Sequence, residues 1–333
     1  MTIALPADAR RLDLQAVQRA LKRLDLDVYA PLGGVLADYV RFYRLALEDE
    51  FPGLRHYLGW VDSYGYRVVA QVFMPARARG TVFLLHGYLD HSGLYGHLIR
   101  DCVAQGHAVF IFDLPGHGLS SGRRIDIDDF AHYQEVLAEI LAAYGPHLPQ
   151  PFYGLGQSTG AAILMDHVLT RCAAQQAPAF RKLLLLAPLV RPVQWAKIRF
   201  GWWLLHHFQT GVPRVFRRNT SDEAFLRFVA ETDPLQDRLV PMGWVGALRQ
   251  WVLRMQAQPR SDYPVLLVQG GRDETVEWRY NNDYVRGRFR VEHEHLEPEA
   301  SHQLANERDD LRAPVHVALA RMLGEADARQ AGR

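Results

Sequence analysis

From Gly80 onward, short apolar runs alternate with segments of helical pattern, and this alternation limits the possible folds more than any other feature. The runs are nearly continuous in apolar residues, as expected for strands that are covered on both faces. Strands separated by helices predict an α/β protein with a mostly parallel central sheet flanked by helices. Ahead of them, RHYLGWVDSYGYRVVAQVFMP predicts a hairpin around an Asp-Ser-Tyr-Gly turn. The apolar runs are TVFLLHG, HAVFIFDLPGHG, PFYGLG, KLLLLAPLV and PVLLVQGG.

Two regions do not follow this alternation of apolar runs and helical segments. Residues 191–258 contain no β run and hold helix-like, tryptophan-rich stretches, so we expect a helical cap, or lid, inserted between two sheet strands. Residues 1–52 show helical spacing on both sides of a proline- and glycine-containing break, which predicts a helical N-terminal extension. The α/β core is then divided into residues 53–190 and 259–333.

Composition limits the class of protein. With 48% hydrophobic and 23% charged residues, a chain of 333 residues can bury a sizeable core. A formal net charge of +1 gives no indication of nucleic-acid binding. Cys102 and Cys172 are too few for a disulfide framework and favour a reducing, cytoplasmic setting. Because no signal-peptide pattern and no apolar stretch of about 20 residues is present, we expect a soluble protein that at most lies on a membrane surface.

One serine stands between glycines at a predicted strand-to-helix corner, in PFYGLGQSTGAAILM. At such a corner, the G-x-S-x-G pattern from Gly156 to Gly160 is typical of a nucleophile elbow. We expect Ser158 in a strained conformation with its hydroxyl pointing out of the sheet, and glycines beside it because larger side chains would collide with neighbouring backbone. The alternative is an incidental serine in an ordinary glycine-rich turn.

A serine hydroxyl needs a base to take its proton, and the expected chain order is nucleophile, acid, histidine. Asp273 follows a predicted buried strand in PVLLVQGGRDETV and is the candidate acid. Glu274 is a rival, and a turn or N-cap role for Asp273 is the alternative. His302, in a loop ahead of the last helix, is the candidate base, and its position distinguishes it among 15 histidines.

Two backbone N–H groups are candidates for an oxyanion hole. Tyr88 follows the His-Gly that ends a predicted strand, and Thr159 follows the nucleophile at the start of a helix. We expect structural roles for the polar residues of the neighbouring loops, namely His86, Asp113 and His117. No His-Glu-x-x-His or paired-cysteine pattern occurs, so we expect neither metal nor cofactor. Candidate substrate-pocket residues are Gln157, His91, Trp195 and Trp202.

Four stretches together resemble the α/β-hydrolase superfamily, and within it the monoacylglycerol lipase and lysophospholipase group, also described as serine aminopeptidase-like hydrolases. The resemblance covers roughly residues 65–325 and implies the α/β-hydrolase fold and hydrolysis of carboxylic esters. Those lipases usually carry histidine before the nucleophile and Met-Gly-Gly after it, whereas this chain has Gln157 before and Thr159-Gly160-Ala161 after. This departure leaves the mechanism intact and bears on the acyl preference. The stretches are HGYLDHSGLY, FDLPGHGLSSGRR, GLGQSTGAA, and GGRDETV with SHQLANE.

The first part of the expected cap is basic and aromatic, and residues 191–220 contain no Asp or Glu. Helical spacing of Trp195, Ile198, Trp202 and Leu205 predicts an amphipathic helix. Its apolar face can pack on the core, which is the commoner arrangement, or rest on anionic lipid. The basic residues are Arg191, Lys197, Arg199, Arg214, Arg217 and Arg218, and the aromatic residues are Trp195, Phe200, Trp202, Trp203, Phe208 and Phe216.

These observations favour a serine hydrolase that cleaves lipid-like carboxylic esters through an acyl-enzyme intermediate. A basic, aromatic cap suits neutral acyl chains beside a phosphate or carboxylate better than the cationic amine of an aminopeptidase substrate. Two alternatives stay open: a peptidase or amidase with the same triad, and a ligand-binding protein of this fold that turns over poorly. The sequence indicates neither acyl-chain length nor oligomeric state.

Overall fold

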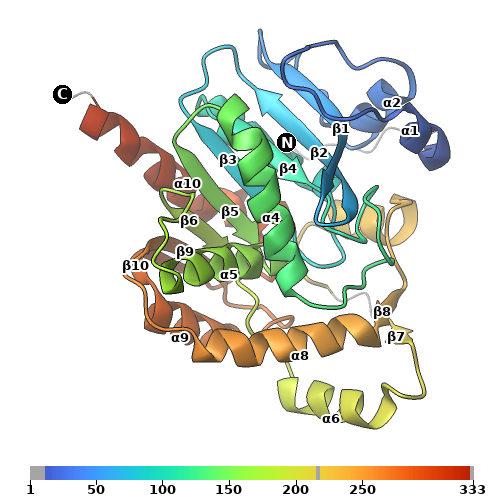
Figure 1. Ribbon diagram of the computed structural model, residues 1–333, viewed down its shortest axis with the longest axis vertical. Helices are drawn as coiled ribbons and strands as arrows, with labels where there is room; N and C mark the ends of the chain where they lie inside the picture. The colour runs from blue at the N-terminus through green and yellow to red at the C-terminus, as the bar shows by residue number, and fades with distance from the viewer. Residues whose placement is uncertain (1–11, 215–217, 331–333) are drawn as a thin grey trace.

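The computed structural model of the protein describes residues 12–214 and 218–330. A sheet of eight strands runs through the molecule in the order β1-β2-β4-β3-β5-β6-β9-β10, with helices on both faces (Figure 1). β2 pairs antiparallel with β1 and β4, and the remaining pairs are parallel. This arrangement confirms the predicted mostly parallel α/β fold and its hairpin. The strands are β1 (Arg55–Ser63), β2 (Tyr66–Met74), β3 (Thr81–Leu85), β4 (Ala108–Phe112), β5 (Phe152–Gln157), β6 (Leu183–Leu186), β9 (Pro264–Gly270) and β10 (Arg290–Glu297).

The two faces of the sheet carry separate hydrophobic cores because successive side chains of a strand point to opposite sides. In β3, Phe83 and Leu85 join one core, and Val82 and Leu84 join the other. Helices α4, α5 and α9 bury side chains in the first core, and α1, α2, α3 and α10 in the second. These helices are α1 (Leu14–Ala20), α2 (Gly34–Phe42), α3 (Gly96–Ala104), α4 (Ala131–Tyr144), α5 (Thr159–Ala173), α9 (Trp278–Arg288) and α10 (Asp309–Gln330).

The N-terminal extension contains two helices on either side of the predicted break, but both are shorter than the helical spacing indicates, and residues 21–33 between them are not helical. There the backbone runs beside the edge strand β1. The N–H of Leu24 donates to the carbonyl of Trp60 and the N–H of Trp60 donates to that of Lys22, each at 2.8 Å. A Cβ on Gly59 would lie 2.9 Å from the Leu24 Cα, so glycine permits this close approach. An edge strand has backbone N–H and C=O groups without partners in the sheet, and here the N-terminal extension pairs with some of those of β1. Residues 1–11 lie outside the described residues.

The cap lies between β6 and β9 in the chain, and Figure 1 shows its elements α6, α8, β7 and β8 at one end of the molecule. Its described residues form three helices and a π-helical turn, Phe228–Thr232. It also contains two three-residue strands that pair antiparallel, so the expectation of a cap without β structure is wrong. Both strands end in proline and are too short to show as an apolar run. Phe216 and Arg217 lie outside the described residues. The cap elements are α6 (Trp195–Leu205), β7 (Gly211–Pro213), α7 (Glu223–Arg227), β8 (Leu239–Pro241) and α8 (Met242–Ala257).

Helix α6 forms where the sequence predicts it, and Ile198, Trp202 and Leu205 line the cavity, but its outer face is not polar. It packs against α8, which lies between α6 and the rest of the molecule in Figure 1. The outward-facing side chains of α6 and the residues just after it include several large apolar groups in contact with solvent. Across the described residues, we find no helix with the length and apolarity needed to cross a bilayer.

Candidate active site

Ser158 stands at the corner between β5 and α5, with backbone angles φ 54° and ψ −111°. A positive φ is unfavourable for any residue with a Cβ and is found where the surrounding structure enforces it. A Cβ on Gly156 would lie 2.5 Å from the backbone nitrogen of Ala161, and one on Gly160 would lie 2.1 Å from the carbonyl oxygen of Leu85. Both distances are far inside van der Waals contact. The expected strain and the need for both glycines are therefore present at this corner.

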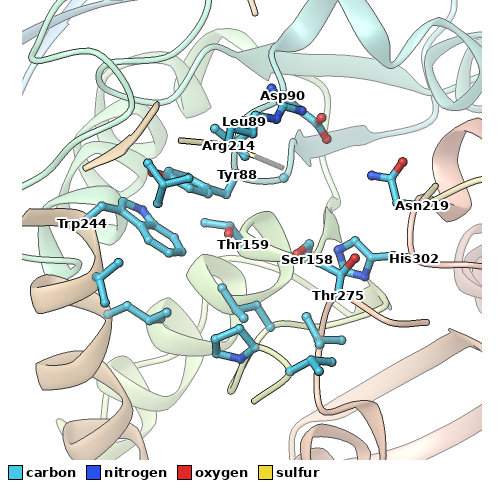
Figure 2. A pocket seen from close by; sticks show the side chains of 18 of the residues that line it. Tyr88, Leu89, Asp90, Ser158, Thr159, Arg214, Asn219, Trp244, Thr275 and His302 are labelled. Atoms are coloured by element: carbon cyan, nitrogen blue, oxygen red, sulfur yellow. The ribbon is translucent and has the colours of Figure 1, made fainter. Parts of the chain in front are cut away.

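Asp273 and His302 meet beside this serine, although they come from separate loops after β9 and β10. Nδ1 of His302 donates to Oδ2 of Asp273 at 2.7 Å, and Figure 2 shows the imidazole next to Ser158. With Nδ1 engaged by the carboxylate, Nε2 is the imidazole nitrogen that can act on the serine hydroxyl. Ser158, Asp273 and His302 are exposed by only 8%, 6% and 6%. Glu274, the rival acid, is exposed.

The Asp273 carboxylate is held as an anion. Burial raises its pKa, but the adjacent His302 and the N–H donors of Thr275 and Val276 outweigh burial, and the net pKa lies below the ordinary range. The Thr275 N–H donates to Oδ1 at 2.8 Å and the Val276 N–H at 3.1 Å. Oδ2 also accepts from the side chain of Gln269 at 2.9 Å. A fixed anion at Nδ1 orients the imidazole and stabilises its protonated form.

The two candidate oxyanion donors lie at the same cavity as Ser158 (Figure 2). Thr159 is the first residue of α5, so its N–H has no acceptor within the helix. Tyr88 belongs to the loop after β3. That loop is held by Tyr95, whose hydroxyl accepts from the Gly87 N–H at 2.8 Å and donates to Oδ2 of Asp90 at 2.9 Å.

His86, Asp113 and His117 have the structural roles that the sequence predicts. His86 Nδ1 donates to the Gly87 carbonyl at 2.8 Å, and its Nε2 accepts from the Leu114 N–H at 2.9 Å. Both ring nitrogens are thus used within the loops. Asp113 accepts from two backbone N–H groups, and His117 Nδ1 donates to the carbonyl of Pro115. Among the described residues, no cluster of three or more His, Cys, Asp or Glu side chains could hold a metal ion.

A cavity of about 740 Å³ opens above Ser158, between the loops of the core and the cap. Its volume lies within the range of small-molecule sites. Most of the lining is apolar and comes from the cap. Polar groups lie both near His302 and beside Tyr88, where Figure 2 shows Arg214. Figure 2 shows Asn219 and Thr275 on the His302 side of Ser158 and Trp244 on the opposite side.

Comparison with known proteins shows the family. Residues 76–309 match the family described as serine aminopeptidase, S33. The chain belongs to this family. The match runs from the loop before β3 to the start of α10, so it covers the whole cap and includes Ser158, Asp273 and His302.

Curated relatives of this S33-family protein include monoacylglycerol lipases. It is 35% identical over 105 residues to a monoacylglycerol lipase of Mycolicibacterium smegmatis, covering 31% of this chain and 38% of the relative. It is 28% identical over 224 residues to the monoglyceride lipase of Mus musculus, covering 64% of this chain and 72% of the relative. The match to the mycobacterial protein thus spans less than half of that protein's length.

Solved structures show the same fold. A soluble variant of the Saccharomyces cerevisiae monoglyceride lipase aligns with a TM-score of 0.67 at 19% identity, over 80% of this chain and 94% of that one. The Paleococcus ferrophilus monoacylglycerol lipase aligns with a TM-score of 0.63 at 19% identity, over 79% and 98%. The fold of this S33-family chain is therefore the α/β-hydrolase fold that the sequence resemblance implies.

Of the four predicted pocket residues of this S33-family chain, Trp202 lines the cavity and the other three do not. Gln157 is fully buried behind His302 and donates to its carbonyl at 2.8 Å. His91 is buried against Asp233 at 2.9 Å, where it joins the core to the cap. Trp195 is 5% exposed and packs into the hydrophobic core. In each case the side chain points into the protein, which sequence position does not reveal.

Several lining residues are absent from the sequence-based set. Asp90 and Gln303 are neighbours of predicted site residues, and the Gln303 side chain donates to Oδ2 of Asp90 at 2.8 Å. Their places beside the HGY and SHQ stretches are the signal that could have found them. Arg214, Asn219 and Trp244 come from the cap. Only the packing of the cap brings these three to the cavity, so no local pattern marks them.

Proposed function

We propose that this protein is a serine hydrolase that cleaves carboxylic esters of lipid type, such as monoacylglycerols or lysophospholipids, through a Ser158-His302-Asp273 triad. The observation that carries the proposal is the strained Ser158 beside an Asp-paired histidine on the floor of a large, mainly apolar cavity. The relatives named monoacylglycerol lipase support the substrate class.

The geometry supports the following reaction. Oγ of Ser158 attacks the ester carbonyl carbon, its proton passes to Nε2 of His302, and the carbonyl oxygen becomes an oxyanion near the Tyr88 and Thr159 N–H groups. As the C–O bond breaks, His302 gives this proton to the departing alkoxide oxygen. Water then attacks the acyl carbon and gives a proton to His302. That proton returns to Ser158 as the fatty acid leaves.

The role of His302 suggests how the two ends of the substrate lie. His302 must protonate the leaving alcohol, so the alcohol lies on the His302 side, where Asn219 and Thr275 are found in Figure 2. The acyl chain then extends toward Trp244 and the apolar side chains of α6 and α8. A polar head on a long apolar tail fits this division.

The charges at the cavity argue against a cationic amine substrate. Two arginines, Arg214 and Arg218, line it, and the carboxylate of Asp90 is engaged by Tyr95 and Gln303. An aminopeptidase site favours acidic groups that can face the substrate ammonium. The ester hypothesis is therefore preferred over the peptidase hypothesis, even though the family description names an aminopeptidase.

The test compares wild type and Ser158→Ala on p-nitrophenyl esters from C2 to C16, a monoacylglycerol and a lysophospholipid. We expect serine-dependent turnover that favours medium or long acyl chains. Turnover retained in Ser158→Ala contradicts the triad. Labelling of Ser158 by a fluorophosphonate without ester turnover favours the amidase alternative, and a stoichiometric burst without turnover favours a ligand-binding protein.

We also propose that α6 brings the enzyme to a lipid surface in a cytoplasmic setting, where the free thiols of Cys102 and Cys172 would stay reduced. On and just after this helix, Phe200, Trp203 and Phe208 are exposed by 63%, 64% and 85%, next to exposed Lys197 and Arg199. Aromatic groups among basic ones suit the interface of an anionic membrane.

Sedimentation with vesicles tests this contact. Wild type should bind vesicles containing phosphatidylserine more strongly than phosphatidylcholine vesicles, and the double variant Trp203→Ser, Phe208→Ser should lose most of the binding. Hydrolysis of p-nitrophenyl acetate by that variant serves as the control and should stay within about twofold of wild type, since both side chains point away from the site. Unchanged vesicle binding in the double variant rules out α6 as the contact.

A further inference from the structure

We propose that Trp244, in the first turn of cap helix α8, positions Tyr88 for catalysis and thereby sets one of the two oxyanion donors. The proposal rests on the proposed ester hydrolysis and on the role given there to the Tyr88 N–H. The six-membered ring of Tyr88 and the Trp244 indole stack with centroids 3.7 Å apart and planes inclined by only 14°. Both residues line the cavity on the same side of Ser158 (Figure 2).

The loop that carries Tyr88 is strained at one residue and is held at several points. Leu89, the next residue, has φ 67°, a strained value for a residue with a Cβ. Hydrogen bonds hold the loop on both sides of Tyr88, at Gly87 and at Asp90. Tyr88 is held through its side chain. Its hydroxyl donates to the Ile125 carbonyl at 2.8 Å, and its ring face lies on Trp244.

Trp244 can act as a fixed reference because α8 is tied to the nucleophile helix. Nε1 of Trp251 donates to Oδ2 of Asp166 at 2.9 Å, and Arg254 pairs with the same carboxylate. Asp166 lies on α5, whose first residue is Thr159, and its side chain is fully buried. Trp244 itself is 7% exposed.

Both oxyanion donors are therefore set by one helix. α5 carries the Thr159 N–H directly, and it holds the Tyr88 N–H through Asp166, α8 and the Trp244 ring. Oxyanion donors act in the transition state, so their placement changes kcat more than substrate affinity. Loss of one such donor costs about 10²–10³ in kcat, and displacement of a donor costs part of that.

The cap supplies a matched control. Trp202 on α6 is also a cavity-lining tryptophan, and its Nε1 donates to the Met242 carbonyl at 2.9 Å. Its stacking partner is His206, not Tyr88. Replacing either tryptophan enlarges the apolar wall and affects the first turn of α8, but only replacement of Trp244 removes the ring on which Tyr88 lies.

The experiment measures kcat and KM on a medium-chain p-nitrophenyl ester for Trp244→Leu, Trp244→Phe and Trp202→Leu. We expect Trp244→Leu to lower kcat about 10- to 100-fold with KM changed by less than about threefold. Trp244→Phe keeps a flat ring and should stay within about threefold of wild type. Trp202→Leu should change KM and leave kcat within about threefold.

Inhibitor affinity gives a second readout. In a trifluoromethyl ketone with the same acyl chain as the ester, the carbonyl carbon is attacked by Oγ of Ser158. The serine proton passes to His302, and the ketone oxygen becomes the oxyanion. Its affinity should fall in Trp244→Leu by about the same factor as kcat/KM. The affinity for the corresponding secondary alcohol, which forms no adduct, should change little.

The proposal is overturned if the kcat of Trp244→Leu stays within about threefold of the wild-type value. It is also overturned if Trp202→Leu lowers kcat as much as Trp244→Leu does. If Trp244→Leu does not fold, Trp244→Phe and Tyr88→Phe decide. Tyr88→Phe removes the bond to Ile125 and keeps the stack, so it should lower kcat less than tenfold. A Trp244→Phe variant that folds as well as wild type with a more than 30-fold lower kcat contradicts support by ring stacking. Failure of the triad itself is seen separately, in Ser158→Ala.

Discussion

The cavity has two walls that are built differently. The core wall consists of strand and helix ends, where Ser158, Asp273 and His302 are almost fully buried and held by backbone hydrogen bonds. The outer wall is α6, which contributes side chains such as Trp202 and Leu205 and exposes its other face to solvent. Changes in the first wall should therefore act on the chemical step, and changes in the second on which acyl chain fits.

The largest effect is expected from Asp273→Asn in the core wall. An amide in place of the carboxylate favours the wrong imidazole tautomer and no longer stabilises the imidazolium, so kcat should fall by about 10³–10⁴ with KM little changed. Glu274→Gln, the neighbouring exposed carboxylate, is the control and should keep kcat within about twofold. Steady-state kinetics on a medium-chain ester measure both. A fall of less than tenfold in Asp273→Asn would show that another group orients His302.

The next effect concerns α8, which belongs to the cap in sequence but to the core wall in its contacts. Asp166→Asn removes the charge that Arg254 and Trp251 share on α5, and hydrogen bonds to a buried charge are worth about 1.5–3 kcal/mol each. Burial raises the pKa of Asp166 in spite of these partners and offsets part of that gain. We expect the free energy of unfolding to fall by about 1–3 kcal/mol in urea titrations.

A surface pair serves as the control for Asp166→Asn. Glu294→Gln breaks the pair with Arg286, both partly exposed, and should cost within about 0.5 kcal/mol. Equal losses in the two variants would mean that α8 is not anchored through Asp166.

The residues of the core wall could be predicted from the sequence more completely than those contributed by the cap. Ser158 and Asp273 follow buried strands, where apolar runs and glycines determine position, whereas His302 follows the partly exposed edge strand β10. The structure brings the three together. Gln157 is the last residue of the strand before Ser158, but its side chain direction depends on the pleat, and it points away from the cavity. The place of Trp244 at the cavity is harder still to predict from the sequence. Its partner Tyr88 is far away in sequence, and their stacking depends on how α8 crosses the core.

A third prediction concerns the outer wall alone. Leu205→Trp places a larger side chain into the cavity, so KM for C12–C16 esters should rise about threefold or more relative to C2–C4 esters, while kcat for p-nitrophenyl acetate stays within about twofold. Leu204→Trp is the matched control, because the neighbouring Leu204 is 52% exposed and faces solvent. If both variants leave the chain-length profile unchanged, the acyl chain does not lie under α6.

The smallest effect is expected away from both walls, in the second core, at His56. This histidine is fully buried, stacks on Phe73 with ring centroids 3.9 Å apart, and has Nε2 3.0 Å from Oε1 of Gln71. Burial lowers its pKa to about 3, although the bond to Gln71 raises it in part. The folded pKa lies below the ordinary value, so the unfolded chain takes up the proton first as the pH falls.

The contribution of neutral His56 to stability is therefore complete above about pH 6.5 and is lost as the pH falls toward 3. His56→Phe keeps a ring on Phe73 and removes the titrating group, so the dependence of unfolding free energy on pH between 6 and 4 should become shallower by up to about 1.4 kcal/mol per pH unit. The slope of unfolding free energy against pH is the informative quantity. In His56→Phe the side-chain oxygen of Gln71 loses its partner, which lowers stability equally at every pH. Chemical denaturation at several pH values measures the slope. An unchanged slope would mean that another group causes the acid sensitivity. An altered kcat at pH 7 would show that substitutions in the second core affect the active site.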